Sequence, residues 1–319
     1  MLKPRHGPNK KSTSQHNQIF SLFGEEKVED INLRKKRMEN LLEYQWRLYS
    51  ELARQRNEIQ DQIKKVLIQS CLSNYEFHHW QRAVKYKYGL HPFSTVGSLS
   101  YIGGRFNTGK GVNSEVPHFP ALYLAKNKDT ALQEHLAQEK PKAGCLTSRE
   151  IALTNPSSET IISVSGHMDK VFDLRTHKSL ESLVKLFKHF TLSNDLIKLG
   201  KDLKITTPTV INTAKSLLGA LLSLHWRREP AISDIPSNSQ IFGHLVYSGE
   251  IEGILYPSKF THQPCLALFP RNCYKTDSFI KIDDETPHKN VPDVINSSNW
   301  RMCDLKFEEI HATINRCSL

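Results

Sequence analysis

Residues Ser100–Glu134 read SYIGGRFNTGKGVNSEVPHFPALYLAKNKDTALQE, and this stretch decides the fold. It opens with a glycine pair and an arginine, continues through a short apolar run around Tyr123, and closes with the start of a helix that carries Glu134. The glycines allow the backbone to pass close to a ligand. Arg105 offers a planar, permanently charged fork that suits phosphate or carboxylate. A strand with Tyr123 and a helix with Glu134 can converge on one cleft, which indicates a site for an anionic substrate with a sugar hydroxyl.

The composition indicates a folded, soluble protein with acidic partners. The chain has 319 residues, of which 38% are hydrophobic and 24% charged, and its mean hydropathy is −0.47. The net charge of +10 favours nucleotides, nucleic acid or an anionic surface as partners. Part of this charge lies in residues 1–22, which we expect to form a disordered basic tail. No nucleic-acid-binding motif supports a role of this tail in binding RNA or DNA.

The cysteines are scattered and show no metal-binding spacing. They form no CxxC pair and have no histidines at zinc-finger spacing, so we expect no metal; the six are Cys71, Cys145, Cys265, Cys273, Cys303 and Cys317. Scattered thiols without a secretory signal are typical of a reduced, cytoplasmic protein. No apolar run reaches the roughly 18 residues that span a bilayer.

The N-terminal part of the chain is predicted to be helical. Apolar residues recur at steps of three and four over 25–70, which predicts one long helix or two consecutive ones in an extension spanning 23–72. Two interpretations stay open: the extension packs back on the rest of the chain, or it is an arm for oligomerisation or for binding a partner. A further helix is predicted over Ser73–Tyr88. Its Arg82 is interpreted as a surface residue of this helix in preference to a second phosphate contact.

The remainder mixes strands and helices. A buried strand is predicted at Ala121–Ala125, followed by a helix that is capped by Asp129 or Thr130, and the loop Lys110–Pro120 between motif segments is expected to be exposed. The other predicted strands are Cys145–Leu153, Glu159–Val164, Gly253–Tyr256 and Cys265–Phe269, and the other predicted helices are Leu180–Leu199, Pro208–His225 and Asn238–Ser248. Residues 271–319 alternate polar loops with two short strand-like pieces, and the segment 276–319 is expected to be peripheral. The fold class is therefore α+β.

Four segments in order resemble the RES domain family, which is named for an arginine, a glutamate and a serine. They are Gly103–Asn107, Ala121–Ala125, Thr130–Glu134, and Gly253–Ser258 followed by Cys265–Phe269. Four segments in the right order are far more specific than any one of them. The run His225-Trp226-Arg227 is also typical of the family.

This resemblance implies a fold and an activity. RES domains are toxins of bacterial toxin–antitoxin pairs and related effectors, with a fold similar to that of ADP-ribosyltransferase toxins: a mixed β core with flanking helices. Here a long N-terminal helical segment precedes that core, and residues 73–275 would form the catalytic, NAD-binding domain. The family consumes NAD as its substrate, and a cognate antitoxin would be a separate chain that covers the cleft.

The family's residues transfer to this sequence by motif. Its arginine falls on Arg105, its glutamate on Glu134 and its serine on Ser258. Tyr123 matches the tyrosine that lines the nicotinamide pocket, and Phe106 stands where the family has an aromatic residue beside the arginine. The neighbouring motif residues Gly104 and Asn107 are assigned to NAD binding with them.

The chemistry of NAD suits these residues. Breaking the bond between nicotinamide and ribose builds positive charge on the ribose carbon, which the Glu134 carboxylate would stabilise while it holds the ribose hydroxyl. Arg105 would bind a phosphate oxygen bidentately. Tyr123 would stack on nicotinamide, which is compatible with a place in a core strand. Ser258 would bond the ribose or orient Glu134; no His–Asp relay makes it a nucleophile.

Three hypotheses remain. In the first, NAD is cleaved with water or phosphate as the acceptor, and NAD depletion makes the protein a toxin or defence effector. In the second, the acceptor is a protein, and the enzyme is a mono-ADP-ribosyltransferase. In the third, the chain is a nucleotide-binding scaffold that acts through its N-terminal helix, which also offers a surface for a homo-oligomer.

Overall fold

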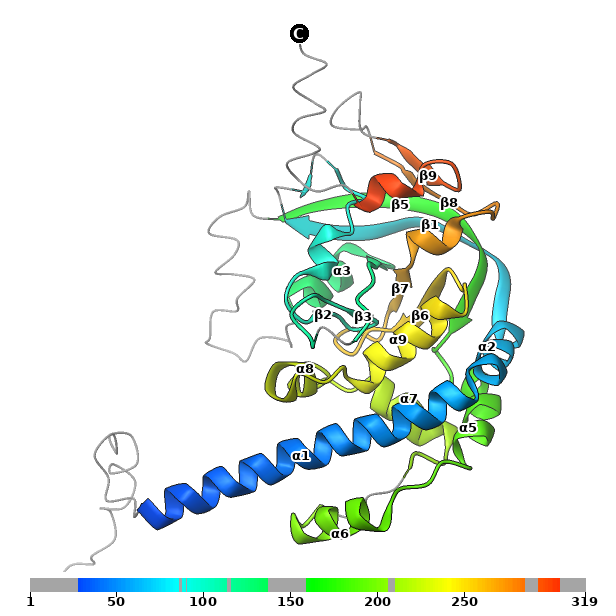
Figure 1. Cartoon of the computed structure of the whole chain (residues 1–319). Helices are drawn as coiled ribbons and strands as arrows, with labels where there is room; N and C mark the ends of the chain where they lie inside the picture. Colours follow the sequence, from blue (N-terminus) through cyan, green and yellow to red (C-terminus); the bar gives the residue numbers. More distant parts are fainter. Residues whose placement is uncertain are drawn as a thin grey trace, which may run out of the picture.

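Two long antiparallel strands, β1 (Cys71–Lys85) and β5 (Glu159–Asp173), curve across the computed structural model (Figure 1). The structure describes residues 28–85, 88–89, 91–113, 116–136, 159–205, 210–284 and 292–304. The predicted tail 1–22 and the predicted strand Cys145–Leu153 lie outside these ranges.

The described strands form a mixed sheet that closes on itself. The order β1-β4-β7-β6-β5 is joined into a ring by the pairing of β5 with β1, and β8 and β9 extend it beside β5. Only β5 and β6 run parallel among these pairs. The remaining bounds are β4 (Leu122–Ala125), β6 (Gly253–Pro257), β7 (Pro264–Leu268), β8 (Phe279–Ile282) and β9 (Val294–Asn296), with a separate small sheet of β2 (Gly103–Gly104) and β3 (Asn107–Thr108).

The prediction of a helix over Ser73–Tyr88 is wrong, because Cys71–Lys85 forms strand β1. Its register shifts between Phe77 and Trp80, where His79 adopts a positive φ of 56°. This β-bulge puts two buried aromatic residues three positions apart, a spacing that imitates a helix. Beyond the bulge, the burial of Trp80, Arg82 and Val84 alternates as in a strand.

The N-terminal extension forms two consecutive helices, which confirms one of the two predicted arrangements. Helix α1 (Val28–Glu58) lies against α6 and α8, and α2 (Gln60–Gln69) packs against α5, α9 and β5. In α2, Ile63 and Leu67 are buried. At the start of α1, Ile31, Leu33 and Met38 are exposed. The extension therefore packs back through its second half, and its first half presents apolar side chains to solvent.

The helices between β5 and β6 are shorter than predicted. The predicted helix Leu180–Leu199 is divided into α5 (Glu181–Phe187) and α6 (Asn194–Asp202), and α7 covers only Ala214–Leu221. Ser193 and Thr213 cap α6 and α7, since each hydroxyl accepts a backbone N–H of the first turn. The predicted helix Asn238–Ser248 is confirmed as α9. The other short elements are α8 (Arg228–Ser233), η3 (Val96–Leu99), η5 (Lys178–Leu180), η6 (Pro270–Cys273) and η7 (Trp300–Asp304).

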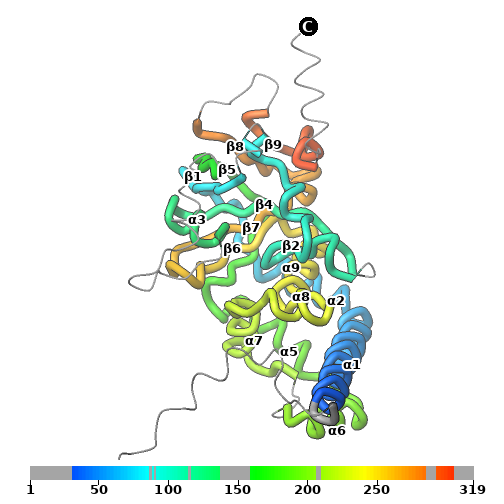
Figure 2. Tube along the Cα trace, turned by 90° about the vertical axis from the view of Figure 1, so that its left-hand side faces the viewer, coloured from blue at the N-terminus to red at the C-terminus, as the bar shows by residue number. Residues whose placement is uncertain are grey.

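Two large apolar clusters lie on opposite faces of the sheet, and a third, small cluster joins Ile102, Val112 and Trp226. On β6, Ile254 and Tyr256 belong to the cluster beneath the helices, whereas Leu255 belongs to the cluster inside the ring. This alternation follows from the period of two in a strand. Figure 2 shows α1 and α6 at one end of the molecule and β8 with β9 at the other. The mixed β core with flanking helices, preceded by a long helix, confirms the α+β class.

The segment after residue 275 is not merely peripheral in its described part. Strands β8 and β9 continue the main sheet, and Ile280, Ile295 and Cys303 are buried in the cluster inside the ring. Within the described residues, no helix has the length and apolar character needed to cross a membrane.

Candidate active site

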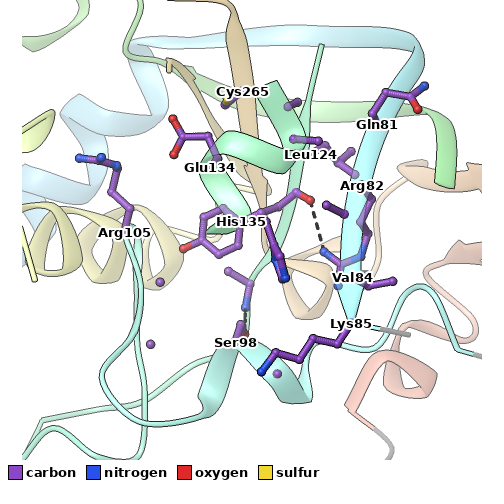
Figure 3. Close-up of a pocket in the computed structure, with 18 of the residues that line it drawn as sticks. Gln81, Arg82, Val84, Lys85, Ser98, Arg105, Leu124, Glu134, His135 and Cys265 are labelled. Atoms are coloured by element: carbon purple, nitrogen blue, oxygen red, sulfur yellow. Dashed lines mark hydrogen bonds between the residues drawn. The ribbon is translucent and has the colours of Figure 1, made fainter. Parts of the chain in front are cut away.

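A cleft of about 720 Å³ opens beside β1 and β4 and contains the central sequence motif. One end is lined by Arg105, Glu134 and the segment Leu224–Arg227, and the opposite end by Lys85 and Ser98. Figure 3 shows Arg105 and Glu134 on one side of this space and Lys85 on the other. Two of the three residues that name the RES motif thus face the same cleft.

The glycine pair is needed for the tight turn between β2 and β3, and not only for the close approach of a ligand. Gly103 has a φ of +88°, which other residues rarely adopt. A Cβ on Gly104 would lie 2.4 Å from the hydroxyl oxygen of Tyr123 and 2.6 Å from Oδ1 of Asn107. The pair is therefore required by the protein's own packing, which brings Arg105 to the edge of the cleft.

Tyr123 and Asn107 hold this turn through polar contacts. The Tyr123 hydroxyl donates to Asn107 Oδ1 at 2.8 Å and accepts from the backbone N–H of Phe106 at 3.0 Å. Asn107 Oδ1 also accepts the N–H of Gly104 at 3.0 Å. Burial raises the pKa of Tyr123 above its usual range, so the phenol stays neutral. Its hydroxyl is used inside the protein, and its ring lines the cleft.

Arg105 is a buried cation with unused hydrogen-bonding capacity. Its side chain is only 6% exposed, and its Nη1 donates to the carbonyl oxygen of Ser223 at 2.7 Å. Its guanidinium carbon lies 5.9 Å from the ring centre of Trp226. Among the described residues it forms no ion pair. A guanidinium has five N–H donors, so most of those of Arg105 remain for a ligand.

Glu134 lies on α3 (Lys128–Leu136), which packs on β1 and β4. The cap of this helix is Asn127 rather than the predicted Asp129 or Thr130, because Asn127 Oδ1 accepts the N–H of Thr130 at 2.9 Å. The Glu134 Oε1 accepts from the hydroxyl of Ser258 at 2.6 Å. It is the only acidic side chain among the cleft-lining residues that the structure describes.

Ser258 lies behind the cleft and not in it. It is 1% exposed, and its Oγ also accepts the backbone N–H groups of Phe260 and Thr261 at 3.1 and 3.3 Å. Of the two predicted roles, the contacts match the orientation of Glu134. The Ser258 hydroxyl is therefore in position to orient the Glu134 carboxylate.

Phe106 and Asn107 also lie behind the surface of the cleft. Both are fully buried, and the Phe106 ring packs edge-on against the Tyr256 ring, with 4.8 Å between the two ring centroids. Tyr256 itself lines the cleft, and burial raises its pKa well above the usual range. The predicted binding residues thus divide into a lining set, Gly104, Arg105, Tyr123 and Glu134, and a supporting set, Phe106, Asn107 and Ser258.

Arg82 is neither a helix-surface residue nor a free phosphate contact. It is 8% exposed on β1, and its guanidinium donates to the carbonyl oxygens of Pro92, Ser94 and Tyr123. Burial lowers its pKa to about 10. Its role is structural, since it ties β1 to β4 and to the loop before η3.

Sequence reasoning missed the roles of Gln240 and of the Trp226-Arg227 pair. Gln240 on α9 is fully buried, and its Nε2 donates to the carbonyl oxygens of Ile102, Gly104 and Asn107. Trp226 and Arg227 line the cleft beside Arg105. The resemblance had marked the run around Trp226 as typical, and no local signal pointed to Gln240.

The loop Lys110–Pro120, which was expected to be exposed, is only partly so, because Val112 and Phe119 are buried.

The side chains that line the cleft give it several positive charges and one carboxylate. Within the described residues, no group of three or more His, Cys, Asp or Glu side chains is placed to hold a metal ion. The arrangement can bind an anion at Arg105 and present a fixed carboxylate to a centre that becomes positive.

Three comparisons relate the chain to known proteins. In the crystal structure of the M.tuberculosis MbcT-MbcA toxin-antitoxin complex, one chain matches with 15% sequence identity over 78% of this chain and 97% of that chain, at a TM-score of 0.39. The comparison with curated proteins found no match. The family model of the RES domain matches residues 79–288, a span that contains Arg105, Glu134 and Ser258. The chain therefore belongs to the RES domain family.

Proposed function

We propose that this protein is an NAD-degrading enzyme that cleaves the bond between nicotinamide and ribose. The observation that carries the proposal is the pairing of Arg105 and Glu134 on one cleft. Arg105 is buried with most of its donors unused, and Glu134 is held by the buried hydroxyl of Ser258. An anion site beside a single oriented carboxylate suits a phosphorylated sugar whose anomeric carbon becomes positive.

The residues divide the work of this reaction. Arg105 binds a phosphate oxygen of NAD through its free N–H groups. Glu134 stabilises the positive ribose carbon and holds the ribose hydroxyl, and Tyr123 offers its ring to the nicotinamide. The glycosidic bond breaks with its electron pair going to the nicotinamide nitrogen, which loses its positive charge. Water or inorganic phosphate then bonds to the ribose carbon and gives up a proton.

The test is product analysis with the purified full chain. NAD is incubated with and without inorganic phosphate, and chromatography follows nicotinamide and the ADP-ribose product. We expect nicotinamide release, with free ADP-ribose when water is the acceptor and a phosphorylated ADP-ribose when phosphate is. Unchanged NAD under both conditions contradicts the proposal. Labelled NAD that marks cellular protein bands would instead favour transfer to a protein.

Two substitutions separate the assigned roles. Glu134→Gln should lower kcat by about 10²–10³-fold with a nearly unchanged KM, because it removes charge stabilisation of the transition state. Arg105→Ala should mainly raise KM, because it removes a binding contact. The controls are Glu181→Gln, an exposed helix carboxylate, and Arg301→Ala, an exposed arginine over the Trp300 ring. Equal activity of a site variant and its control would refute that residue's role.

We further propose that NAD depletion makes the protein a toxin, with a second chain as its antitoxin. Membership of the RES family supports this, and the open, positively charged cleft offers such a chain a surface to cover. Induced expression of the wild-type chain should arrest growth and lower cellular NAD, whereas Glu134→Gln at equal protein level should do neither. Growth arrest by both would separate toxicity from the cleft.

A further inference from the structure

Two arginines lie near one indole ring at the end of the cleft that carries Arg105. The guanidinium carbon of Arg227 lies 4.5 Å from the ring centre of Trp226, and that of Arg105 lies 5.9 Å from the same centre. Trp226 is 4% exposed, whereas Arg227 is exposed and lines the cleft. A buried indole can hold a guanidinium plane by cation–π contact and leave its N–H edge free for a ligand.

Arg227 has no compensating partner among the described residues. Its guanidinium forms no hydrogen bond and no ion pair there and lies over the Trp226 ring, while its backbone carbonyl accepts the N–H of Ala231. Partial burial and the charge of Arg105 lower the pKa of Arg227, while Glu134 opposes this effect. An anion that binds to both guanidinium groups would lower the repulsion between their like charges.

The other cations at this cleft do not offer the same geometry. The guanidinium of Arg82 is committed to three carbonyl oxygens, and Lys85 lies at the far end (Figure 3). Arg105 and Arg227 are thus the two guanidinium groups that line the cleft with donors to spare among the described residues. Adjacent guanidinium forks match the oxygens of a phosphate or pyrophosphate group.

We infer that Arg227 is a second phosphate-binding residue of this cleft and acts together with Arg105, whose guanidinium lies near the same Trp226 ring. The inference rests on the proposed function and goes beyond it by adding a residue outside the arginine, glutamate and serine of the motif. The bound phosphate comes either from the pyrophosphate of NAD or from inorganic phosphate as the acceptor. Arg227 contributes binding and positioning, and the carboxylate chemistry stays with Glu134.

The experiment compares Arg227→Ala, Arg227→Lys and Arg301→Ala in the full chain. Arg301 is a matched control, because it too stacks on a tryptophan, with its guanidinium carbon 5.4 Å from the Trp300 ring centre, but it does not line the cleft. We measure the KM for NAD in phosphate-free buffer, the KM for inorganic phosphate at saturating NAD, and the calorimetric Kd of ADP.

Arg227→Ala should raise the Kd of ADP or one of the two KM values by about 10–100-fold, the range for loss of charged hydrogen bonds, with kcat changed less than about threefold. Arg227→Lys should recover part of the loss, because it keeps the charge without the fork. A raised KM for NAD identifies the pyrophosphate as the ligand, and a raised KM for phosphate identifies the acceptor.

The inference is overturned when Arg227→Ala and Arg301→Ala give equal values in all three measurements and both melt like the wild type. This outcome is distinct from a failure of the proposed function. A wild-type chain that leaves NAD intact refutes the enzyme activity, whereas the Kd of ADP still reports whether Arg227 binds phosphate.

Discussion

Ser258 lies 124 positions after Glu134, yet its hydroxyl donates to the Glu134 carboxylate at 2.6 Å. The same oxygen accepts two backbone N–H groups, which fix its position. A donor held in this way can orient the carboxylate from outside the cleft. We therefore propose that the serine of the motif acts through its effect on the glutamate.

We expect Ser258→Ala to lower kcat for NAD by about tenfold or more, because Glu134 loses the hydrogen bond that orients it. The KM should change little, since Ser258 does not line the cleft. Ser258→Thr keeps a hydroxyl and should retain more activity than Ser258→Ala. Steady-state kinetics with melting curves checks this; equal loss in both variants at unchanged stability contradicts a positioning role.

At the scale of elements, α9 connects the helical layer to the turn that carries Arg105. Gln240 sits in the first turn of α9, where its Oε1 accepts the N–H of Ser237 in a capping box. Its Nε2 donates to three carbonyl oxygens around the β2–β3 turn. One buried side chain thus both begins a helix and fixes the loop beside the cleft.

Gln240→Leu should destabilise the fold by about 2–4 kcal/mol, because the carbonyl oxygens of Ile102, Gly104 and Asn107 lose the donor that Gln240 supplies, and among them Ile102 keeps the N–H of Gly109. It should also raise the KM for NAD, since the turn that positions Arg105 loses its anchor. Denaturant unfolding and steady-state kinetics measure the two effects. Gln62→Leu, an exposed glutamine on α2, is the matched control and should change neither.

Strand β1 could not be recognised from the local sequence pattern. A strand is recognised by alternating burial, and the β-bulge between Phe77 and Trp80 interrupts that alternation. The predicted helix at α9 was confirmed because its cap and its apolar spacing are local. Local signals were therefore sufficient for α9, whereas β1 depends on pairing with β5, which lies far along the chain.

At the scale of the whole molecule, the described end of the chain closes onto the wall of the cleft. The Nε2 of His91 donates to the carbonyl oxygen of Met302 at 2.6 Å, and the Thr95 hydroxyl donates to that of Cys303 at 2.9 Å. His91 is 3% exposed, and its Nδ1 has no hydrogen-bond partner among the described residues. Helix η7 thus docks against a buried histidine.

This arrangement predicts a pH dependence of stability. Burial lowers the pKa of His91 below its usual value near 6.5, with Arg82 adding to the effect and the Met302 carbonyl opposing it. The unfolded chain therefore takes up a proton first as the pH falls. The histidine's contribution is complete above about pH 6.5 and is lost as the pH falls toward the folded-state pKa, with a slope of at most about 1.4 kcal/mol per pH unit.

His91→Gln should flatten the fall in the free energy of unfolding between about pH 6.5 and 5, since glutamine does not titrate. Urea unfolding at several pH values measures this slope. His189→Gln, at an exposed position, should leave it as in the wild type. A His91→Gln slope equal to that of the wild type would remove His91 as the cause.

Short motifs and local periodicity lie in neighbouring residues, so they were enough to predict the RES family and the α+β class; they also give Arg105, Glu134 and Ser258 as candidate site residues. Three contacts are visible only in the tertiary structure. Ser258 donates a hydrogen bond to Glu134 from behind the cleft, the guanidinium of Arg82 donates to carbonyl oxygens, and Arg227 and Arg105 lie near the same Trp226 ring. These contacts join segments far apart in the chain. Closure of the β1–β5 ring and packing of the helices bring them together, and no local pattern in the sequence records that.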